Sequence, residues 1–223
     1  HNTQVQEFAD ALERGMDLVV VDPRFSVAAS KARYWLPIKP GTDTALLLAW
    51  MHVIITENRF DEDYVEAHTV GFDRLRAHVA DKTPEWAHVR TGLDPQLIRE
   101  SARLIASARP ASLIHPGRRA TWYGNDTQRV RAMAILSALL GSIGRRGGIT
   151  QPTKMQVPPL SLPEMPTPAR PAADQPREGG FPFATETLAS GLRDATLPNY
   201  APYEIKGWLV YGTNLIQALP QPQ

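Results

Sequence analysis

Two aspartates stand where a carboxylate can bind a nucleotide. Asp22 directly follows the apolar run Leu18–Val21, and Asp43 precedes the apolar segment 44–57. An acidic residue at the end of a strand accepts hydrogen bonds from a ribose or a base edge in nucleotide-binding sheets. Guanine presents an N1–H and an exocyclic amine side by side, and one carboxylate can accept both. Local structural roles suit the same positions, because aspartate starts turns before proline and caps helices. The residue types alone leave both roles open.

The elements that position these aspartates follow from the spacing of the apolar residues. The spacing predicts helices over Gln4–Arg14, Thr44–Glu57, Asp94–Ala108 and Asp126–Ile143, and a further helix that begins in Asp61–Ala67. It predicts short strands over Leu18–Val21, Ala111–His115 and Lys206–Tyr211.

The first of these strands, Leu18–Val21, has no polar alternation, which is typical of a strand buried on both faces of a parallel sheet. Short strands that alternate with helices favour an α/β fold with a parallel, Rossmann-like nucleotide-binding sheet, whose ligands lie at the carboxyl ends of the strands. Thr42 or Asp43 is expected to cap the helix over 44–57.

Prolines gather after residue 150 and divide the chain. We expect an α/β domain over 1–150, a proline-rich loop or linker over 151–182, and the incomplete start of a further α/β segment over 183–223.

The composition argues against several classes of protein. The formal net charge is +1, from 24 Lys and Arg against 23 Asp and Glu, which argues against nucleic-acid binding. Because the chain has no cysteine, it cannot itself form disulfides, thiolate zinc sites or iron–sulfur ligation. The longest apolar stretch, 45–56, is too short to span a membrane. The six histidines form no tight ligand pair, so no protein-ligated metal is expected.

Two segments carry a family resemblance. Residues 20–24 read Val-Val-Asp-Pro-Arg, and residues 35–46 read Trp-Leu-Pro-Ile-Lys-Pro-Gly-Thr-Asp-Thr-Ala-Leu. In sequence and spacing they resemble the signature of the molybdopterin oxidoreductase family, of the dimethyl sulfoxide reductase type. The resemblance continues through 61–69, 117–129 and 139–148. It is greatest to the catalytic subunits of the polysulfide, thiosulfate and tetrathionate reductase branch.

This resemblance implies a bis(molybdopterin guanine dinucleotide) cofactor, one guanine-dinucleotide arm of which this chain would hold. The implied binding residues are Val21, Asp22, Pro23, Arg24, Lys39, Pro40, Gly41, Thr42 and Asp43. Gly212 and Asn214 resemble the start of the family's next nucleotide-binding segment, although Leu215 stands where proline is frequent. The motifs together favour the ligand role of the two aspartates over the local one.

Arg118 and Arg119 are the candidate catalytic residues. By resemblance, their loop approaches the molybdenum, where a guanidinium would attract an anionic sulfur substrate and stabilise charge that develops as a sulfur–sulfur bond breaks. The alternative is that both arginines pair with carboxylates or with cofactor phosphates.

The resemblance also implies that the chain is an internal part of a longer catalytic subunit. A [4Fe–4S] cluster and the metal ligand are then expected outside this chain. The expected partners are a small inorganic sulfur substrate, an iron–sulfur electron-transfer subunit and a membrane anchor subunit, at the periplasmic face of the membrane in anaerobic respiration. Two alternatives stay open: a noncatalytic relative of the NADH dehydrogenase large-subunit type, and a free-standing nucleotide-binding module. Asp22, Lys39, Gly41 and Asp43 favour the oxidoreductase.

Overall fold

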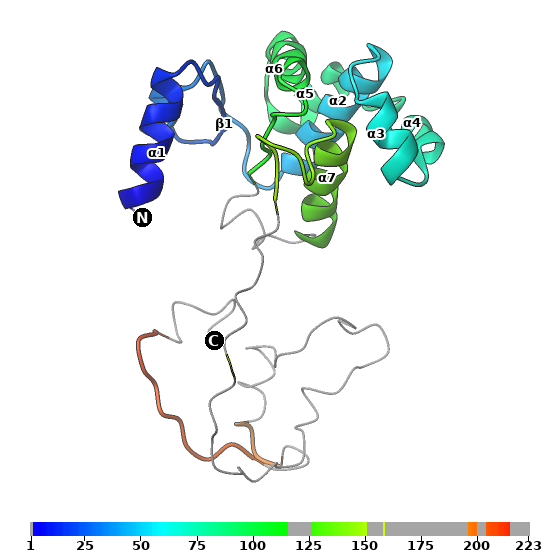
Figure 1. The fold of residues 1–223 in the computed structure, drawn as a ribbon. Helices are drawn as coiled ribbons and strands as arrows, with labels where there is room; N and C mark the ends of the chain where they lie inside the picture. Colours follow the sequence, from blue (N-terminus) through cyan, green and yellow to red (C-terminus); the bar gives the residue numbers. More distant parts are fainter. Residues whose placement is uncertain (1, 116–125, 151–157, 159–195, 200–203, 215–223) are drawn as a thin grey trace. The chain divides into compact units, whose positions relative to one another are not determined.

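The computed structural model describes residues 2–115, 126–150, 158, 196–199 and 204–214 (Figure 1). The chain divides into two units, His1–Lys154 and Met155–Gln223. Every assigned helix and strand of the described residues lies in the first unit. The division at residues 150 and 182 stays a prediction, and nearly all of the proline-rich stretch lies outside the described residues.

The described residues of the first unit form helices and two short strands. The helices are α1 (Asn2–Glu13), α2 (Asp43–Thr56), α3 (Glu62–His68), α4 (Phe72–Val79), α5 (Pro84–Thr91), α6 (Pro95–Ser107) and α7 (Asp126–Leu139), and Ala29–Lys31 form a single 3₁₀ turn. The strands are β1 (Val19–Val21) and β2 (Tyr34–Leu36). The predicted helices are confirmed with small shifts at their ends, whereas α4 and α5 were not predicted.

Side-chain caps fix where several helices begin. The Asp61 carboxylate accepts a 3.0 Å hydrogen bond from the Tyr64 N–H at the start of α3. Asp94 accepts one of 2.7 Å from the Gln96 N–H at the start of α6, where Pro95 has no N–H of its own to satisfy. These local contacts explain why the sequence predicts both starts correctly.

The strands form a small parallel sheet. Val19 lies opposite Tyr34, Val20 opposite Trp35 and Val21 opposite Leu36. The strand over Tyr34–Leu36 is not among those that the sequence predicts, and β1 is half-buried rather than buried on both faces. The fold is a mixed α/β arrangement, and the two strands found in the described part of the chain are fewer than a Rossmann-like sheet requires.

Two other predicted strands are corrected. Residues 111–115 form no strand, and neither do residues 206–211, where Leu209 and Tyr211 are 97% and 94% exposed. Both segments are apolar enough for a strand, but no ladder partner pairs with either among the described residues. α7 also ends at Leu139 rather than Ile143, because Gly141 adopts a φ of 61° and turns the chain.

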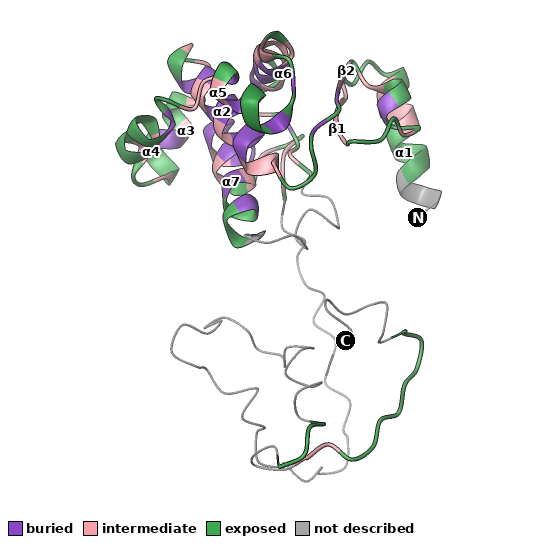
Figure 2. Cartoon of the chain, turned by 180° about the vertical axis from the view of Figure 1, so that it is seen from behind, coloured by how far each residue is buried: buried purple, intermediate pink, exposed green. Residues whose placement is uncertain are grey.

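Helix α2 is the centre of the hydrophobic core. It contacts α4, α5, α6 and α7, and apolar residues on all its sides suit a helix that is enclosed by others. Leu46, Met51 and Ile54 in α2 are almost fully buried. Buried residues, purple in Figure 2, gather on α2 and on α6 and α7 beside it. The segment that carries Asp43 at its first residue is thus held by the main core of the unit.

Candidate functional site

Asp22 lies at the carboxyl end of β1 and is half-buried. Its N–H donates to the Leu36 carbonyl at 3.2 Å, which continues the ladder between the strands. Its carboxylate accepts a 2.8 Å hydrogen bond from the Arg24 N–H. This is the local turn role that the sequence left open, and the exposed side chains of Pro23 and Arg24 follow it.

The indole of Trp35 holds this turn against β2. Trp35 Nε1 donates to the Asp22 carbonyl at 2.9 Å, and its ring meets the Phe25 ring edge-on, with the ring centres 4.8 Å apart. The backbone around Asp22 is therefore fixed on both sides of the carboxylate. A fixed backbone is what a carboxylate needs to bind a ligand in one orientation.

The loop between β2 and α2 carries Lys39–Asp43. Ile38 anchors it in the core at 3% exposure, while Lys39, Pro40 and Gly41 are exposed. Gly41 has a φ of 82°, and a Cβ added there would meet no atom within 4 Å. The loop thus turns sharply through a left-handed residue and leaves open space beside it.

Lys39 is bound to the end of α5. Its N–H donates to the Thr91 carbonyl at 3.1 Å, and a Cβ added at Gly92 would lie 3.2 Å from Lys39 Cε. The stem of the lysine therefore packs over a glycine whose φ of 75° ends α5. This packing restricts the positions that the Lys39 ammonium group can adopt.

The N-terminus of α2 has no side-chain cap. The expectation that Thr42 or Asp43 caps it is wrong, because the Thr42 hydroxyl donates to the Lys39 carbonyl at 2.7 Å instead. The backbone N–H groups of the first helical turn are therefore not satisfied by a capping side chain, and a helix N-terminus attracts negative charge.

Asp43 forms an ion pair with Arg129 of α7. The distance from Arg129 Nε to Asp43 Oδ2 is 3.5 Å, and the two side chains are 4% and 30% exposed. The cation lies inside the unit and the carboxylate lies nearer its surface.

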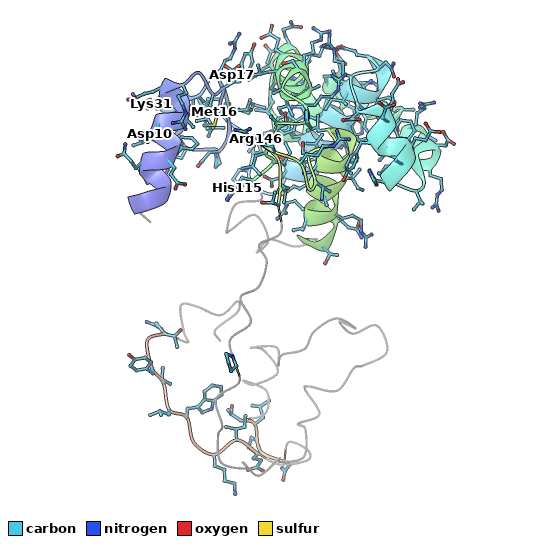
Figure 3. The ribbon with its side chains drawn as sticks, in the orientation of Figure 1. Asp10, Met16, Asp17, Lys31, His115 and Arg146 are labelled. Carbon is cyan, nitrogen blue, oxygen red and sulfur yellow. The ribbon has the colours of Figure 1, made fainter. Side chains whose placement is uncertain are left out.

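Two of the predicted segments follow paired strands. Val21 ends β1 and residues 22–24 come after it, while Lys39–Asp43 come after β2, so both segments lie beyond the carboxyl ends of the two parallel strands. Gly212, with a φ of 67°, and Asn214 lie in the second unit and are exposed. Arg118 and Arg119 follow His115, labelled in Figure 3, and lie outside the described residues.

Sequence reasoning missed two residues of the site, Gly92 and Arg129. A signal was present, because Arg129 shares its helix face with Ala132 and Leu136, which are buried. A charged residue on the apolar face of a helix predicts a buried partner.

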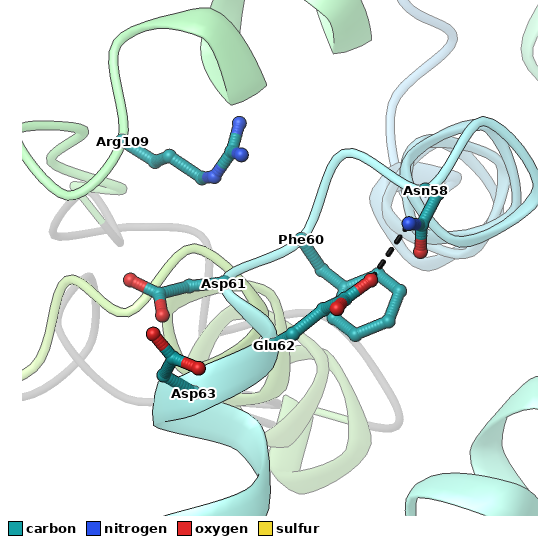
Figure 4. A pocket seen from close by; sticks show the side chains of 6 residues that line it. All are labelled: Asn58, Phe60, Asp61, Glu62, Asp63 and Arg109. Atoms are coloured by element: carbon teal, nitrogen blue, oxygen red, sulfur yellow. Dashed lines mark hydrogen bonds between the residues drawn. The ribbon is translucent and has the colours of Figure 1, made fainter.

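A concavity of about 400 Å³ lies elsewhere in the first unit and is lined by Asn58, Phe60, Asp61, Glu62, Asp63 and Arg109 (Figure 4). Two of its acidic side chains already have partners within the chain. Glu62 accepts a 2.6 Å hydrogen bond from Asn58, and Asp61 pairs with Arg145 at 2.7 Å. Across the described ranges, no cluster of three or more His, Asp or Glu side chains is placed to hold a metal ion. Within the same ranges no helix is both long enough and apolar enough to cross a bilayer.

Known proteins resemble the chain over nearly its whole length. The molybdopterin-containing subunit of thiosulfate reductase from Salmonella typhimurium is 32% identical over 96% of this chain and 30% of its own length. The molybdopterin-containing subunit of arsenate respiratory reductase from a Shewanella species is 30% identical over 98% of this chain and 30% of its own length. The chain therefore spans about 30% of these relatives.

A solved structure and a family model agree with these relatives. Acetylene hydratase from Pelobacter acetylenicus has 35% sequence identity and a TM-score of 0.61, with 65% of this chain and 20% of that chain covered. The model of the family described as molybdopterin oxidoreductase matches residues 3–221. The chain thus belongs to the molybdopterin oxidoreductase family, which implies a molybdopterin cofactor.

Proposed function

We propose that this chain holds one guanine-dinucleotide arm of the cofactor in a molybdenum-dependent oxidoreductase. The observation that carries the proposal is the position of Asp22 and Asp43 after the carboxyl ends of paired parallel strands. Ligands of parallel α/β sheets bind at this edge. We extend the proposal to the fold: the β1–β2 pair is part of a Rossmann-like sheet in the full-length protein.

The residues present suit a guanine dinucleotide. Carboxylates accept hydrogen bonds from the N–H groups of guanine, and Asp43 is the better candidate because Asp22 also accepts from the Arg24 N–H. The exposed Lys39 and the α2 N-terminus, which lacks a side-chain cap, suit phosphate groups. When bound, the molybdopterin centre supplies the redox chemistry, and this chain contributes grip and orientation.

The proposed substrate is an inorganic sulfur compound of the thiosulfate, polysulfide or tetrathionate class. Similarity to a thiosulfate reductase subunit over 96% of this chain supports this choice. Arg118 and Arg119 are proposed to attract the anionic substrate and to stabilise developing charge. A [4Fe–4S] cluster, an iron–sulfur partner, a membrane anchor and a periplasmic position complete the proposal for anaerobic respiration.

The cofactor role is tested in the natural full-length protein with Asp43→Asn and Asp22→Asn. Molybdenum and acid-released guanine nucleotide are measured per chain. We expect Asp43→Asn to lower both by about tenfold, because hydrogen bonds to charged groups contribute about 1.5–3 kcal/mol. Asp17→Asn is the matched control, since Asp17 forms an exposed pair with Arg33. Wild-type cofactor content in both test variants would refute the role, and wild-type protein without molybdenum would favour a noncatalytic relative.

The substrate class is tested by reduction assays with thiosulfate, polysulfide, tetrathionate and arsenate. We expect turnover with a sulfur compound and full cofactor content but reduced turnover in Arg118→Ala or Arg119→Ala. Turnover with arsenate alone would contradict the sulfur assignment. Unchanged turnover in both arginine variants would remove these residues from the mechanism.

A further inference from the structure

Arg129 is buried although it carries a charge that cannot be removed. Its side chain is 4% exposed, and it shares a face of α7 with the core residues Ala132 and Leu136. A buried guanidinium is unfavourable unless a carboxylate pairs with it, and removing one partner from such a pair is strongly destabilising. The ion pair with Asp43 is therefore one of the interactions that hold Arg129 inside the unit.

The pair is asymmetric between core and surface. Arg129 approaches Asp43 Oδ2 with Nε at 3.5 Å, and the Asp43 side chain keeps 30% of its surface exposed. Charge-assisted hydrogen bonds are typically about 2.7–2.9 Å long. The Arg129 guanidinium therefore attracts the Asp43 carboxylate from the core, but the separation is too long for a strong hydrogen bond between them.

Another ion pair of the unit has a different character. The Asp61 carboxylate lies 2.7 Å from Arg145 Nη1 and also accepts the Tyr64 N–H at 3.0 Å. The Asp61 carboxylate thus both caps α3 and forms a short ion pair with Arg145. Asp43 has no capping role, since α2 has no side-chain cap.

Two positive influences act on the same carboxylate. The N-terminus of α2 favours negative charge at Asp43, which is its first residue. Arg129 adds a full charge from within the core. Both place positive charge beside the Asp43 carboxylate oxygens, and a carboxylate only accepts hydrogen bonds. Such a group suits a base edge with two adjacent N–H donors and repels an edge that presents an acceptor, as the N1 of adenine does.

We propose that Arg129 is a positioning residue that holds the Asp43 carboxylate in the orientation that the paired N–H donors of a guanine base require. The proposal rests on the nucleotide-binding role proposed for Asp43. Arg129 acts through Asp43 and determines which base edge the site accepts.

The test is a double-variant cycle in the full-length holoenzyme. The variants are Arg129→Met, Asp43→Asn and the combination of the two, with Arg131→Met as the matched control. Arg131 is an exposed arginine of the same helix that contacts Gln128. The readouts are the rate at which guanine nucleotide leaves the protein on mild heating and the melting temperature of each variant.

We expect Arg129→Met to accelerate nucleotide loss by about tenfold, while Arg131→Met leaves it unchanged. In the Asp43→Asn background the additional effect of Arg129→Met should fall below about twofold, because the group that Arg129 positions is gone. Should Arg129→Met fail to fold, Arg129→Lys takes its place in the cycle. It keeps the charge but displaces it, so we expect an acceleration of about threefold that again vanishes with Asp43→Asn.

The outcomes separate this inference from the function on which it rests. If Asp43→Asn retains nucleotide like the wild type, the proposed function fails. If Asp43→Asn loses nucleotide but the Arg129 variants do not, only the positioning role is overturned. Effects that multiply in the double variant would mean that Arg129 acts independently of Asp43, which also overturns it.

Discussion

The Glu57 carboxylate at the end of α2 lies 2.7 Å from Arg103 Nη2 of α6, and Arg103 Nε donates to the same carboxylate at 2.9 and 3.0 Å. Arg59 adds a further contact of 2.8 Å. The hydrogen bond from Arg103 is the main reason that the pKa of Glu57 lies below its ordinary value, and Arg59 lowers it further. The ion pair between Glu57 and Arg103 therefore joins the end of α2 to α6.

Glu57→Gln is expected to lower the free energy of unfolding by about 1 kcal/mol at pH 7, since the pair is partly exposed. A carboxylate whose pKa is lower in the folded state contributes stability above its unfolded pKa and loses it as the pH falls through the folded value. The difference between variant and wild type should therefore shrink below about pH 4. Thermal unfolding across pH checks this, with the exposed Glu66→Gln as control. A difference that stays constant down to low pH would contradict the assignment.

Ser101→Ala is expected to destabilise α2 against α6. Trp50 Nε1 donates to Ser101 Oγ at 2.9 Å in the core, and a buried indole N–H without an acceptor costs about 1–3 kcal/mol. Hydrogen exchange of α2 peptides in the full-length protein measures the effect. Ser107→Ala, at an exposed position of the same helix, should change little, and equal effects in the two variants would argue against the buried hydrogen bond.

Gly41→Ala and Gly141→Ala should differ in size. Gly41 has a φ of 82° but open space around it, so alanine costs only the backbone strain of about 1 kcal/mol. At Gly141 an added Cβ would clash with Asp61 Oδ2, which forces Asp61 away from Tyr64 and Arg145. We expect the loss of melting temperature to be clearly larger for Gly141→Ala. A larger loss of melting temperature for Gly41→Ala would contradict this, because it would mean that a side chain at residue 41 meets atoms that the open space around Gly41 does not show.

Leu136→Ala is expected to lower the free energy of unfolding by about 2–5 kcal/mol, because Leu136 of α7 is fully buried and its truncation leaves a cavity. Ile135 of the same helix is only partly buried, so Ile135→Ala should cost less. Chemical denaturation of the full-length protein, followed by hydrogen exchange of α7, compares the two. Similar losses of unfolding free energy in the two variants would mean that α7 is rotated about its axis, so that Leu136 is no more buried than Ile135.

The sequence predicted the features that depend on neighbouring residues and missed those that depend on distant ones. The starts of α3 and α6 were correct because Asp61 and Asp94 cap them locally. β2 was missed because its three residues form a strand only by pairing with β1. For the same reason the apolar run 206–211 was wrongly predicted as a strand, since apolar character alone supplies no ladder.

The candidate site divides in the same way. The motif assigns Asp22 and Asp43 to one binding site, which stays a prediction, and the parallel register of β1 and β2 is consistent with it because each aspartate follows one of the two strands. Arg129 lies far along the chain from Asp43, and no local pattern relates the two residues. Only the packing of α7 on α2 brings them within 3.5 Å.

The packing of Lys39 over Gly92 couples two positions that lie far apart in the sequence. A side chain at residue 92 would strain a backbone with a φ of 75° and would also crowd Lys39 Cε. We therefore expect a residue other than glycine at position 92 mainly in homologues that have a shorter side chain at position 39. In those homologues the turn at the end of α5 should also have a different backbone conformation. The two positions should covary across the family, even though only one of them carries a charge that a cofactor can use.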